Sequence, residues 1–395
     1  MFVYLDNSAT TRQYDEVTET MLHYMKNEFG NPSSLYRLGM NAEKALKESR
    51  KAIAKALSAT DEEIFFTSGG TESDNTAIFG AAEAGKRRGK RIITTAVEHP
   101  AVLEAVKRLE NSGFEAVYIP VLKDGKLDTE AFKKAVNDET ILITMMQVNN
   151  ENGMIMPISE VAEYKEKYNK EHGTNILMHV DAVQSFGKMR VMKPGIDMVS
   201  VSGHKIHGPK GIGALYVKKK TNIRPYIVGG GQEKHFRSGT ENVPAIAGFG
   251  TAAEIAYSNL DERLSKMKEA RDYLLAGIKS QIKDIRINSI EESSVSGEEG
   301  LCSPSVLNIS FLGTRGEVIL HTLEQEGIYI STGSACSSNK KGRSHVLSAM
   351  GLSDKEIEGA LRFSFSSDLT IEDMDYVLDK LTAAVGRFRK LGTFR

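Results

Sequence analysis

Apolar runs alternate with amphipathic stretches between residues 64 and 217, and this alternation constrains the fold more than any other feature. Helical patterns occur near 71–87, 100–110, 128–137 and 157–171. The strand-like runs between them are IFFT (64–67), RIITT (91–95), AVYIPV (116–121), ILITMMQV (141–148), ILMHVDA (176–182), MVSVSG (198–203) and GALYV (213–217). Strands that alternate with helices pair in parallel through crossovers. We therefore predict an α/β domain with a mostly parallel sheet flanked by helices.

The pattern changes near residue 258. A long amphipathic helix is expected over 259–282, and the polar stretch 288–300 is expected to be a loop. Strand-like segments (305–312, 328–332, 360–366) and helical segments (315–326, 371–388) follow, which is typical of a smaller α+β domain. With 395 residues, the chain also exceeds the size at which a single hydrophobic core stops growing, so two domains are expected. We predict a large domain over 15–257 and a small domain formed by 1–14 and 258–395.

Composition and charge exclude several classes of protein. The chain is 40% hydrophobic and 26% charged, as in soluble globular proteins, and its net charge of −1 offers no surplus of Lys and Arg for nucleic acid. Two cysteines cannot form a disulfide framework and suit a reducing compartment. The N-terminus lacks the features of a signal peptide, and no window resembles a membrane span. We expect a cytoplasmic protein that binds neither membranes nor nucleic acid directly.

Two polar clusters follow strands, where open parallel sheets bind ligands. TSGGTESDN (67–75) opens a helix, so its glycines and free N–H groups suit an anion. It is no Walker A motif, because no Gly-Lys-Ser/Thr follows, and an ordinary strand-to-helix turn explains it as well. His99 in AVEHPAV (96–102) also follows a strand, although a lone histidine is more often structural than catalytic.

Asp181 and Lys205 carry a stronger signal. Asp181 in HVDAVQS (179–185) ends an apolar run, so it either caps a helix or pairs with a cationic ligand atom. Lys205 in SVSGHKIHGPKGIG (200–213) lies between two histidines, directly after another strand. Desolvation lowers the pKa of a lysine and makes it a nucleophile for Schiff-base chemistry. With a phosphate cradle, this pair suggests pyridoxal phosphate as cofactor. No metal site is predicted.

Seven motifs extend this pattern across the chain between YLDNSATT (4–11) and RFSFS (362–366). They are GGTESDN, VEHPAV, VNNENG (148–153), HVDAVQ, SGHKIHGPKG, RSGTENV (237–243) and STGSACSS. In type and order they resemble the NifS/IscS-type cysteine desulfurases, which are class V aminotransferase-like enzymes of fold type I. The resemblance implies a large pyridoxal phosphate domain, a smaller C-terminal domain and a homodimer.

The resemblance also implies roles for single residues. Lys205 matches the lysine that holds the cofactor as a Schiff base, and Asp181 matches the partner of the pyridine nitrogen. The other matches are Gln184 (ring hydroxyl), His99 (ring stacking and proton shuttle), Thr71, Ser202 and His204 (phosphate), and Thr240 (phosphate of the partner subunit's site). Asn150 and Arg362 match the residues that bind the substrate carboxylate, a task that suits the bidentate guanidinium.

Cys336 matches the nucleophile on a loop of the small domain. The resemblance implies that it takes sulfur from L-cysteine, leaving alanine and a persulfide, and passes the sulfur to an acceptor. Nearby Lys340, Lys341, Arg343 and His345 would help to ionise the thiol. Gln147 stands where many family members carry histidine, and the Cys336 loop is more basic than usual. That basic loop suits an acidic iron–sulfur scaffold or a tRNA-modifying sulfurtransferase. Cys302 matches no catalytic position, and we interpret it as structural.

Three other activities stay open at this stage. A class V aminotransferase has no use for Cys336, whereas a selenocysteine lyase would use it differently. An inactive sulfur-relay or scaffold protein is disfavoured by the presence of Lys205, Asp181 and His99. The yellow colour of bound pyridoxal phosphate would exclude a cofactor-free binding module.

Overall fold

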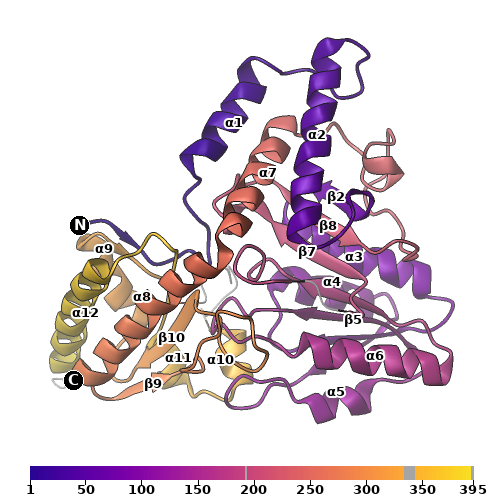
Figure 1. Cartoon of the computed structure of the whole chain (residues 1–395). Coiled ribbons are helices and arrows are strands. Elements are labelled where there is room, and N and C mark those ends of the chain that lie inside the picture. The colour runs from indigo at the N-terminus through magenta and orange to yellow at the C-terminus, as the bar shows by residue number, and fades with distance from the viewer. Residues whose placement is uncertain (192–193, 333–342, 393–395) are drawn as a thin grey trace.

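The computed structural model describes residues 1–191, 194–332 and 343–392. Cys336, Lys340 and Lys341 lie outside the described residues. A large part of the molecule, built on one broad sheet, adjoins a smaller part that carries both chain termini (Figure 1).

One seven-stranded sheet forms the centre of the large part. Its order is β2 (Ile64–Thr67), β8 (Gly213–Val217), β7 (Met198–Ser202), β6 (Leu177–Asp181), β5 (Thr140–Met146), β3 (Arg91–Thr95) and β4 (Glu115–Ile119). All neighbours are parallel except β8, which is antiparallel to both β2 and β7. The mostly parallel sheet predicted from the sequence is therefore confirmed.

Helices cover both faces of this sheet, and the alternation of side chains explains why. Ile92 and Leu142 contribute to a core with α3 (Gly70–Gly85) and α4 (Pro100–Glu110). Their neighbours Ile93 and Ile143 point to the opposite face, where α6 (Ile158–His172) packs. Strands covered on both sides need apolar residues at every position, and β5, β6, β7 and β8 are buried throughout.

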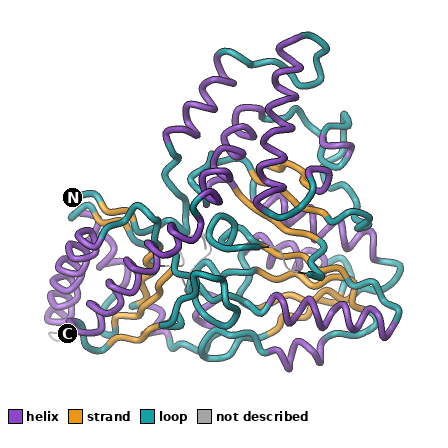
Figure 2. Tube along the Cα trace, viewed as in Figure 1, coloured by secondary structure: helices purple, strands orange, loops and turns teal. Residues whose placement is uncertain are grey.

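The remaining helices of the large part extend away from this sheet or lie at its margin. They are α1 (Asp15–Lys26), α2 (Arg37–Ala56), α5 (Thr129–Ala135) and α7 (Val243–Ser258). Helices α1 and α2 both pack on α7 and project from the body of the molecule (Figure 2). None of the helices in the described part of the chain is long and apolar enough to cross a membrane.

The smaller part has its own core. Its antiparallel strands lie in the order β12 (Ala360–Ser364), β10 (Val306–Phe311) and β9 (Ile285–Ile287), and β1 (Val3–Tyr4) pairs in parallel with β11 (Ile328–Tyr329). The helices are α8 (Leu260–Gln281), α9 (Gly316–Gln325), α10 (His345–Ala349), α11 (Asp354–Glu358) and α12 (Ile371–Gly392).

The N-terminal residues pack with this smaller core. Val3 and Leu5 share a hydrophobic cluster with α8 and α12, whereas Val346 and Leu347 of α10 belong to the cluster of the large sheet. The predicted domain boundaries, 15–257 against 1–14 with 258–395, stay a proposal.

Candidate active site

The carboxyl ends of neighbouring parallel strands bring most of the predicted cofactor residues to one edge of the sheet. Strand β6 ends at Asp181 and β7 ends at Ser202, with Lys205 in the short turn that follows. His99 comes four residues after β3, and Asn150 comes four residues after β5. Parallel strands place such residues together because their carboxyl ends meet at one edge.

Lys205 is held by a segment that the sequence analysis had not assigned to the site. Its Nζ atom donates hydrogen bonds to the backbone oxygens of Ser8 (2.6 Å) and Ala9 (2.8 Å). The Ser8 oxygen also accepts a hydrogen bond from Gln184 Nε2 at 2.9 Å. Thr10 Oγ1 lies 3.2 Å from His204 Nδ1. The N-terminal segment thus completes one side of the site.

Asp181 is a buried carboxyl suited to a cationic partner. Its Oδ1 atom accepts a hydrogen bond from the Val183 backbone N–H at 2.9 Å. Burial raises the pKa of Asp181 to about 6, while the Val183 hydrogen bond and the charge of Lys205 act in the opposite direction. A protonated ring nitrogen beside this carboxyl would favour its ionised form.

A second buried polar layer, missed by the sequence analysis, lies near Asp181. His179 Nε2 is 3.6 Å from Asp74 Oδ1, and His179 Nδ1 is 2.8 Å from Thr144 Oγ1. Burial raises the pKa of Asp74 well above its usual value and lowers that of His179 to about 3. Burial also raises the pKa of Glu98 to about 8. Desolvation thus favours the uncharged form of all three groups, and His179 is neutral near pH 7.

His99 is the N-cap residue of α4, so it has a structural role in this helix. Its Nδ1 atom accepts a hydrogen bond from the Ala101 backbone N–H at 3.1 Å. Burial, then the charges of Lys205 and His345, lower the pKa of His99 to about 4. The ring is therefore neutral near pH 7 and carries its proton on Nε2. Its stacking on the cofactor stays a prediction.

Residues around the start of α3 form a cradle that fits a phosphate group. Gly69 has φ +154°, a conformation that other residues rarely adopt, and Gly70 opens the helix. A Cβ atom on Gly70 would lie only 2.6 Å from Val183 Cγ2. Ser202 Oγ is buried and has no hydrogen-bond partner among the described residues. The free helix N–H groups and this hydroxyl suit the phosphate of pyridoxal phosphate.

The other predicted phosphate ligands differ in their placement. Thr71 is exposed in the first turn of α3, and burial lowers the pKa of His204 to about 4. Thr240 is exposed in the loop before α7. Its neighbour Glu241 lines a cavity of about 580 Å³ with Arg50. Among the described residues, none of the predicted cofactor ligands lines that cavity, and this includes Thr240 itself.

Arg362 and Asn150 lie in contact with each other, and their binding of a substrate carboxylate stays a prediction. Arg362 lies on β12, is 4% exposed, and donates from Nη1 to the backbone oxygen of Asn150 at 2.9 Å. Its Nη2 atom donates to Asp6 Oδ1 at 2.7 Å. Asp6 is a further residue that the sequence analysis did not assign.

Lys188 is a buried amine that no sequence signal distinguished from a surface lysine. Its Nζ atom lies 3.4 Å from Gln184 Oε1, four residues earlier in the chain. Burial, followed by the charges of Lys205 and Arg362, lowers the pKa of Lys188 to about 7.

The described residues on either side of 333–342 contact the site. The backbone N–H and oxygen of Ser331 pair with those of Arg362 at 3.1 and 2.7 Å. On the other side, Ser344 Oγ donates to the Glu151 carboxylate, and His345 Nε2 donates to the backbone oxygen of Glu98 at 2.9 Å.

Arg343 and Cys302 have ordinary structural contacts. Arg343 forms an exposed ion pair with Asp354 at 2.6 Å. Cys302 is buried, its Sγ atom lies 3.2 Å from the Asn152 backbone oxygen, and burial raises its pKa. A thiol in that state is a poor nucleophile.

Comparison with known proteins identifies the family. Residues 3–377 match the model of the family described as aminotransferase class-V. A protein of Dictyoglomus turgidum named cysteine desulfurase IscS is 43% identical over 395 residues, covering 100% of this chain and 97% of the relative. The chain belongs to the cysteine desulfurases of the class-V aminotransferase family. A Methanosarcina thermophila protein of the same name is 43% identical over 391 residues, which cover 98% and 93% of the two chains.

Solved structures agree with this membership. A structure titled NifS-like protein has a TM-score of 0.89 and 39% identity, with 98% of this chain and 100% of that chain covered. A second, titled SspA in complex with cysteine, has a TM-score of 0.77 and 33% identity over 92% of this chain and 98% of that chain. The predicted family resemblance, fold class and dependence on pyridoxal phosphate are confirmed. The roles of single residues stay predictions.

Proposed function

We propose that this protein is a pyridoxal phosphate-dependent cysteine desulfurase that converts L-cysteine to L-alanine and leaves the sulfur as a persulfide on Cys336. The contacts of Ser331 with Arg362 and of His345 with Glu98 carry this proposal. Cys336 is five residues after Ser331, a length of chain that spans up to about 18 Å. Cys336 is therefore tethered within reach of the predicted carboxylate site.

The residues around Lys205 fit the cofactor. Lys205 would hold it covalently, Asp181 would face the ring nitrogen, and Gln184 and His99 would contact the ring hydroxyl and the ring face. Phosphate ligands would be Thr71, Ser202 and His204, with Thr240 of the partner subunit. When bound, pyridoxal phosphate withdraws electrons from the Cα atom of an amino acid and so weakens the bonds around it.

The chain's own residues bind the substrate and move the sulfur. Arg362 and Asn150 bind the carboxylate of L-cysteine, and the neutral His99 exchanges protons at Nε2. The Cys336 thiolate attacks the sulfur of the substrate, and the new S–S bond forms as the Cβ–S bond breaks. The electron pair left on Cβ takes a proton, so alanine leaves and the persulfide remains. The structure titled SspA in complex with cysteine supports this choice of substrate.

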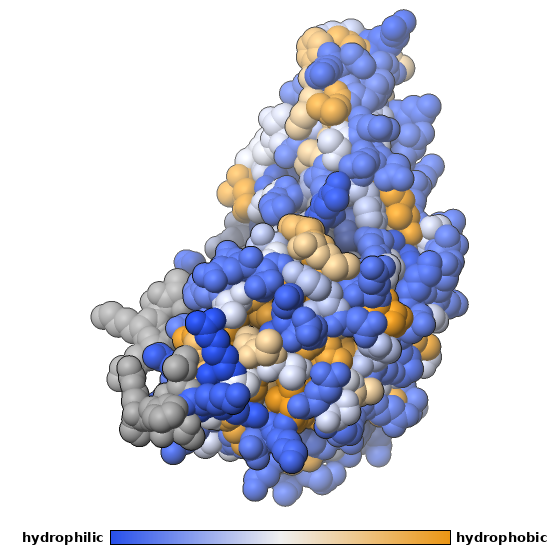
Figure 3. Space-filling model, turned by 90° about the vertical axis from the view of Figure 1, so that its left-hand side faces the viewer, coloured by the Kyte–Doolittle hydropathy of each residue, from blue (hydrophilic) through white to orange (hydrophobic). Residues whose placement is uncertain are grey.

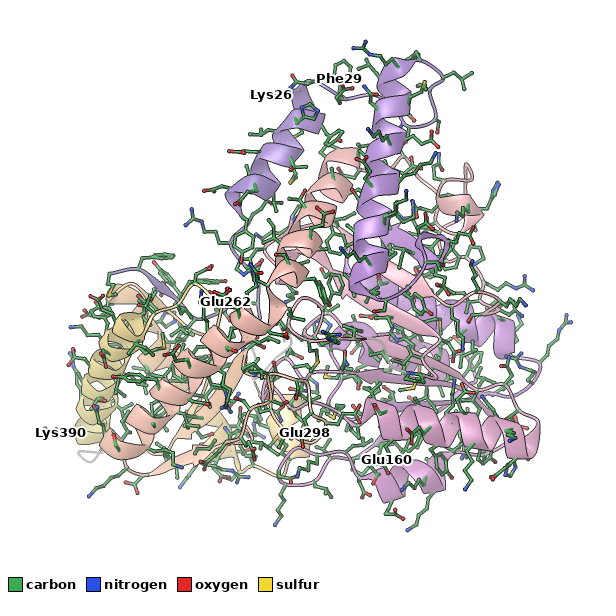
Figure 4. The ribbon with its side chains drawn as sticks, in the orientation of Figure 1. Lys26, Phe29, Glu160, Glu262, Glu298 and Lys390 are labelled. Carbon is green, nitrogen blue, oxygen red and sulfur yellow. The ribbon has the colours of Figure 1, made fainter. Side chains whose placement is uncertain are left out.

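The active enzyme is a homodimer in this proposal. Large apolar side chains are exposed on α1, on α2 and between them: Leu22, Met25, Phe29, Leu35, Tyr36 and Met40. Phe29 is 68% exposed and Leu35 is 95% exposed. In Figure 4 the labels of Lys26 and Phe29 mark the projecting end of this helix pair. Apolar surface is also visible there in the space-filling view (Figure 3). A second copy of the chain would cover this surface.

In this proposal the persulfide sulfur passes, in the cytoplasm, to an iron–sulfur scaffold or a tRNA-modifying sulfurtransferase. The basic residues of segment 340–345 favour an acidic acceptor. Mixing the persulfide enzyme, labelled with ³⁵S, with an acidic scaffold and with a sulfurtransferase tests this choice. The acceptor that takes up label at the higher rate is the preferred one, and uptake by neither would contradict both.

Mass spectrometry after incubation with L-cysteine, without reductant, tests the reaction. We expect the Cys336 peptide to gain the mass of one sulfur atom and alanine to appear. Cys336→Ser should retain the cofactor and lose the persulfide, whereas the matched variant Cys302→Ala should keep both. Bound cofactor without persulfide or alanine would refute the proposal and favour an aminotransferase.

Mixed dimers test whether Thr240 acts across the interface. A dimer of one Lys205→Ala chain and one Thr240→Val chain keeps one intact site if Thr240 serves the partner's cofactor. That site should bind pyridoxal phosphate as tightly as the wild type. Weak binding at the remaining Lys205 site would instead show that Thr240 acts within its own chain. Wild-type binding by the Thr240→Val homodimer would show that Thr240 serves neither site.

A further inference from the structure

We infer that Asp6 is a built-in counter-ion of the substrate-carboxylate site and that it weakens carboxylate binding at Arg362. The inference rests on the proposed function for the assignment of Arg362 to the substrate. Its direct support is the ion pair between Asp6 Oδ1 and Arg362 Nη2, 2.7 Å apart. The two side chains are 20% and 5% exposed, so water screens this pair only partly.

The guanidinium of Arg362 needs such a partner in the free enzyme. A buried charge without a counter-ion is costly, and the charges of Lys205 and Arg362 both reach the amine of Lys188, whose pKa they help burial to lower. Glu151 is a second acid near Arg362, but burial raises its pKa and Ser344 already donates to its carboxylate. Asp6 is therefore the carboxylate in direct contact with Arg362.

The backbone holds Asp6 in this position. Asp6 forms a parallel bridge with Ser364, which lies on β12 two residues after Arg362. The Ser364 N–H donates to the Leu5 oxygen at 2.7 Å, and the Ser8 N–H donates to Ser364 Oγ at 2.9 Å. Because these contacts pair the segment around Asp6 with the strand that carries Arg362, the backbone of Asp6 stays beside Arg362 when a ligand arrives.

The guanidinium still has donors to offer a second carboxylate. It carries five N–H groups, of which those to Asn150 and Asp6 use two. Its Nε atom is buried and has no hydrogen-bond partner among the described residues. A substrate carboxylate would therefore join Asp6 on one guanidinium, and the two negative charges would repel each other.

This repulsion acts on substrate and product alike, because L-cysteine and L-alanine carry the same carboxylate. Binding that is equal in the ground state and the transition state lowers KM without raising kcat. Asp6 would thus keep the affinity for the amino-acid carboxylate moderate and help alanine to leave. The site would prefer amino acids with a single carboxylate, since a second negative charge is repelled more strongly.

Asp6→Asn in the pyridoxal phosphate-loaded dimer tests this inference, because asparagine keeps the shape and an acceptor oxygen but removes the charge. We expect KM for L-cysteine and the inhibition constant of L-alanine to fall together by about ten-fold, with no rise in kcat. Propionate, a bare carboxylate, should raise the thermal midpoint of the variant at about ten-fold lower concentration than it does for the wild type. If Asp6→Asn bound L-alanine and propionate no more tightly than the wild type does, the inference would be overturned.

Two controls separate charge from structural damage. Tyr4→Phe removes the hydrogen bond from Tyr4 Oη to the Thr10 oxygen in the same segment but leaves the ion pair intact. This variant should bind L-alanine and propionate as the wild type does. Adding Asp6→Asn to Arg362→Gln should bring no gain in propionate affinity, and a gain there would contradict the assigned target. If the wild type forms no alanine from L-cysteine, the proposed function fails, but the propionate comparison still tests the ion pair.

Discussion

The Nζ atom of Lys205 lies 2.6 Å from the backbone oxygen of Ser8, a residue 197 positions earlier in the chain. The same oxygen accepts a hydrogen bond from Gln184, so three distant segments meet at one carbonyl group. The predicted cofactor lysine is therefore positioned by the N-terminal segment as well as by the turn after β7. This arrangement makes the first residues of the chain part of the site.

Lys205→Ala should abolish the borohydride-stable attachment of pyridoxal phosphate and leave the fold intact. The Ser8 oxygen keeps the Gln184 hydrogen bond, so the loss of stability should be about 1 kcal/mol. Mass spectrometry after borohydride reduction measures the attachment. Lys188→Met is the matched control, because it removes a buried amine of the same site and should leave the attachment at Lys205 unchanged. Attachment that persists in Lys205→Ala would assign the cofactor to another lysine.

Asp181→Asn should weaken retention of pyridoxal phosphate by about 10- to 100-fold, the effect of losing one charge-assisted hydrogen bond. The carboxyl is buried and its ionised form needs a cation, which the pyridine nitrogen would supply. Equilibrium dialysis against a series of cofactor concentrations measures the change. Asp197→Asn is a useful comparison, since Asp197 is a buried aspartate on the same sheet that pairs with Lys165 instead. If Asp181→Asn retained the cofactor as well as wild type, its assigned role would be wrong.

Residues such as Asp181 and Lys205 could be predicted because their signal is local. Each follows directly after an apolar run, and the ends of parallel strands meet whatever the details of packing. The same reasoning predicted the sheet, apart from the antiparallel direction of β8. Direction is set by the connection after β7, which turns back without a helical crossover, and strand composition does not encode it.

Asp6, Lys188 and Glu151 could not be predicted because their roles depend on long-range pairing. Asp6 meets Arg362 across 356 positions, and Lys188 resembles any surface lysine in its local sequence. Its burial arises only when the fold brings the turn after β6 close to Lys205 and Arg362. The family resemblance supplied the role of Cys336, which lies outside the described residues.

Lys188 should make the stability of the cofactor-free enzyme depend on pH above neutrality. Its pKa is about 7 when folded, against an ordinary 10.5, so between these values the unfolded chain binds a proton that the folded chain lacks. The free energy of unfolding should therefore rise with pH in this window, by at most about 1.4 kcal/mol per pH unit from this group. Below pH 7 both states hold the proton and the dependence on Lys188 ends.

Lys188→Met isolates this contribution, because methionine fills similar space without a titratable group. The variant should exceed the wild type in stability most at pH 7, and the difference should shrink by about 2 kcal/mol by pH 9. Chemical denaturation at several pH values measures it. Lys170→Met, at an exposed position of α6, should show no such trend. A constant difference between pH 7 and 9 would mean that Lys188 is charged in the folded protein.

Ser344→Ala should lower the free energy of unfolding by about 2–4 kcal/mol, because Ser344 Oγ makes two contacts at once. It accepts the Leu347 N–H at 3.0 Å as the N-cap of α10, and it donates to the buried Glu151 carboxylate. Losing a cap costs about 1 kcal/mol, and leaving a buried carboxylate without its donor costs a further 1–3 kcal/mol.

Ser348→Ala is the matched control, because Ser348 lies on the same helix and its Oγ donates to the Ser344 oxygen at 2.7 Å without touching Glu151. Its cost should stay below about 1 kcal/mol. Since Ser344 follows the segment that carries Cys336, Ser344→Ala should also reduce persulfide formation per bound cofactor, and Ser348→Ala should not. If Ser344→Ala cost no more stability than Ser348→Ala and gave the same persulfide yield, the Glu151 contact would neither stabilise α10 nor position the Cys336 segment.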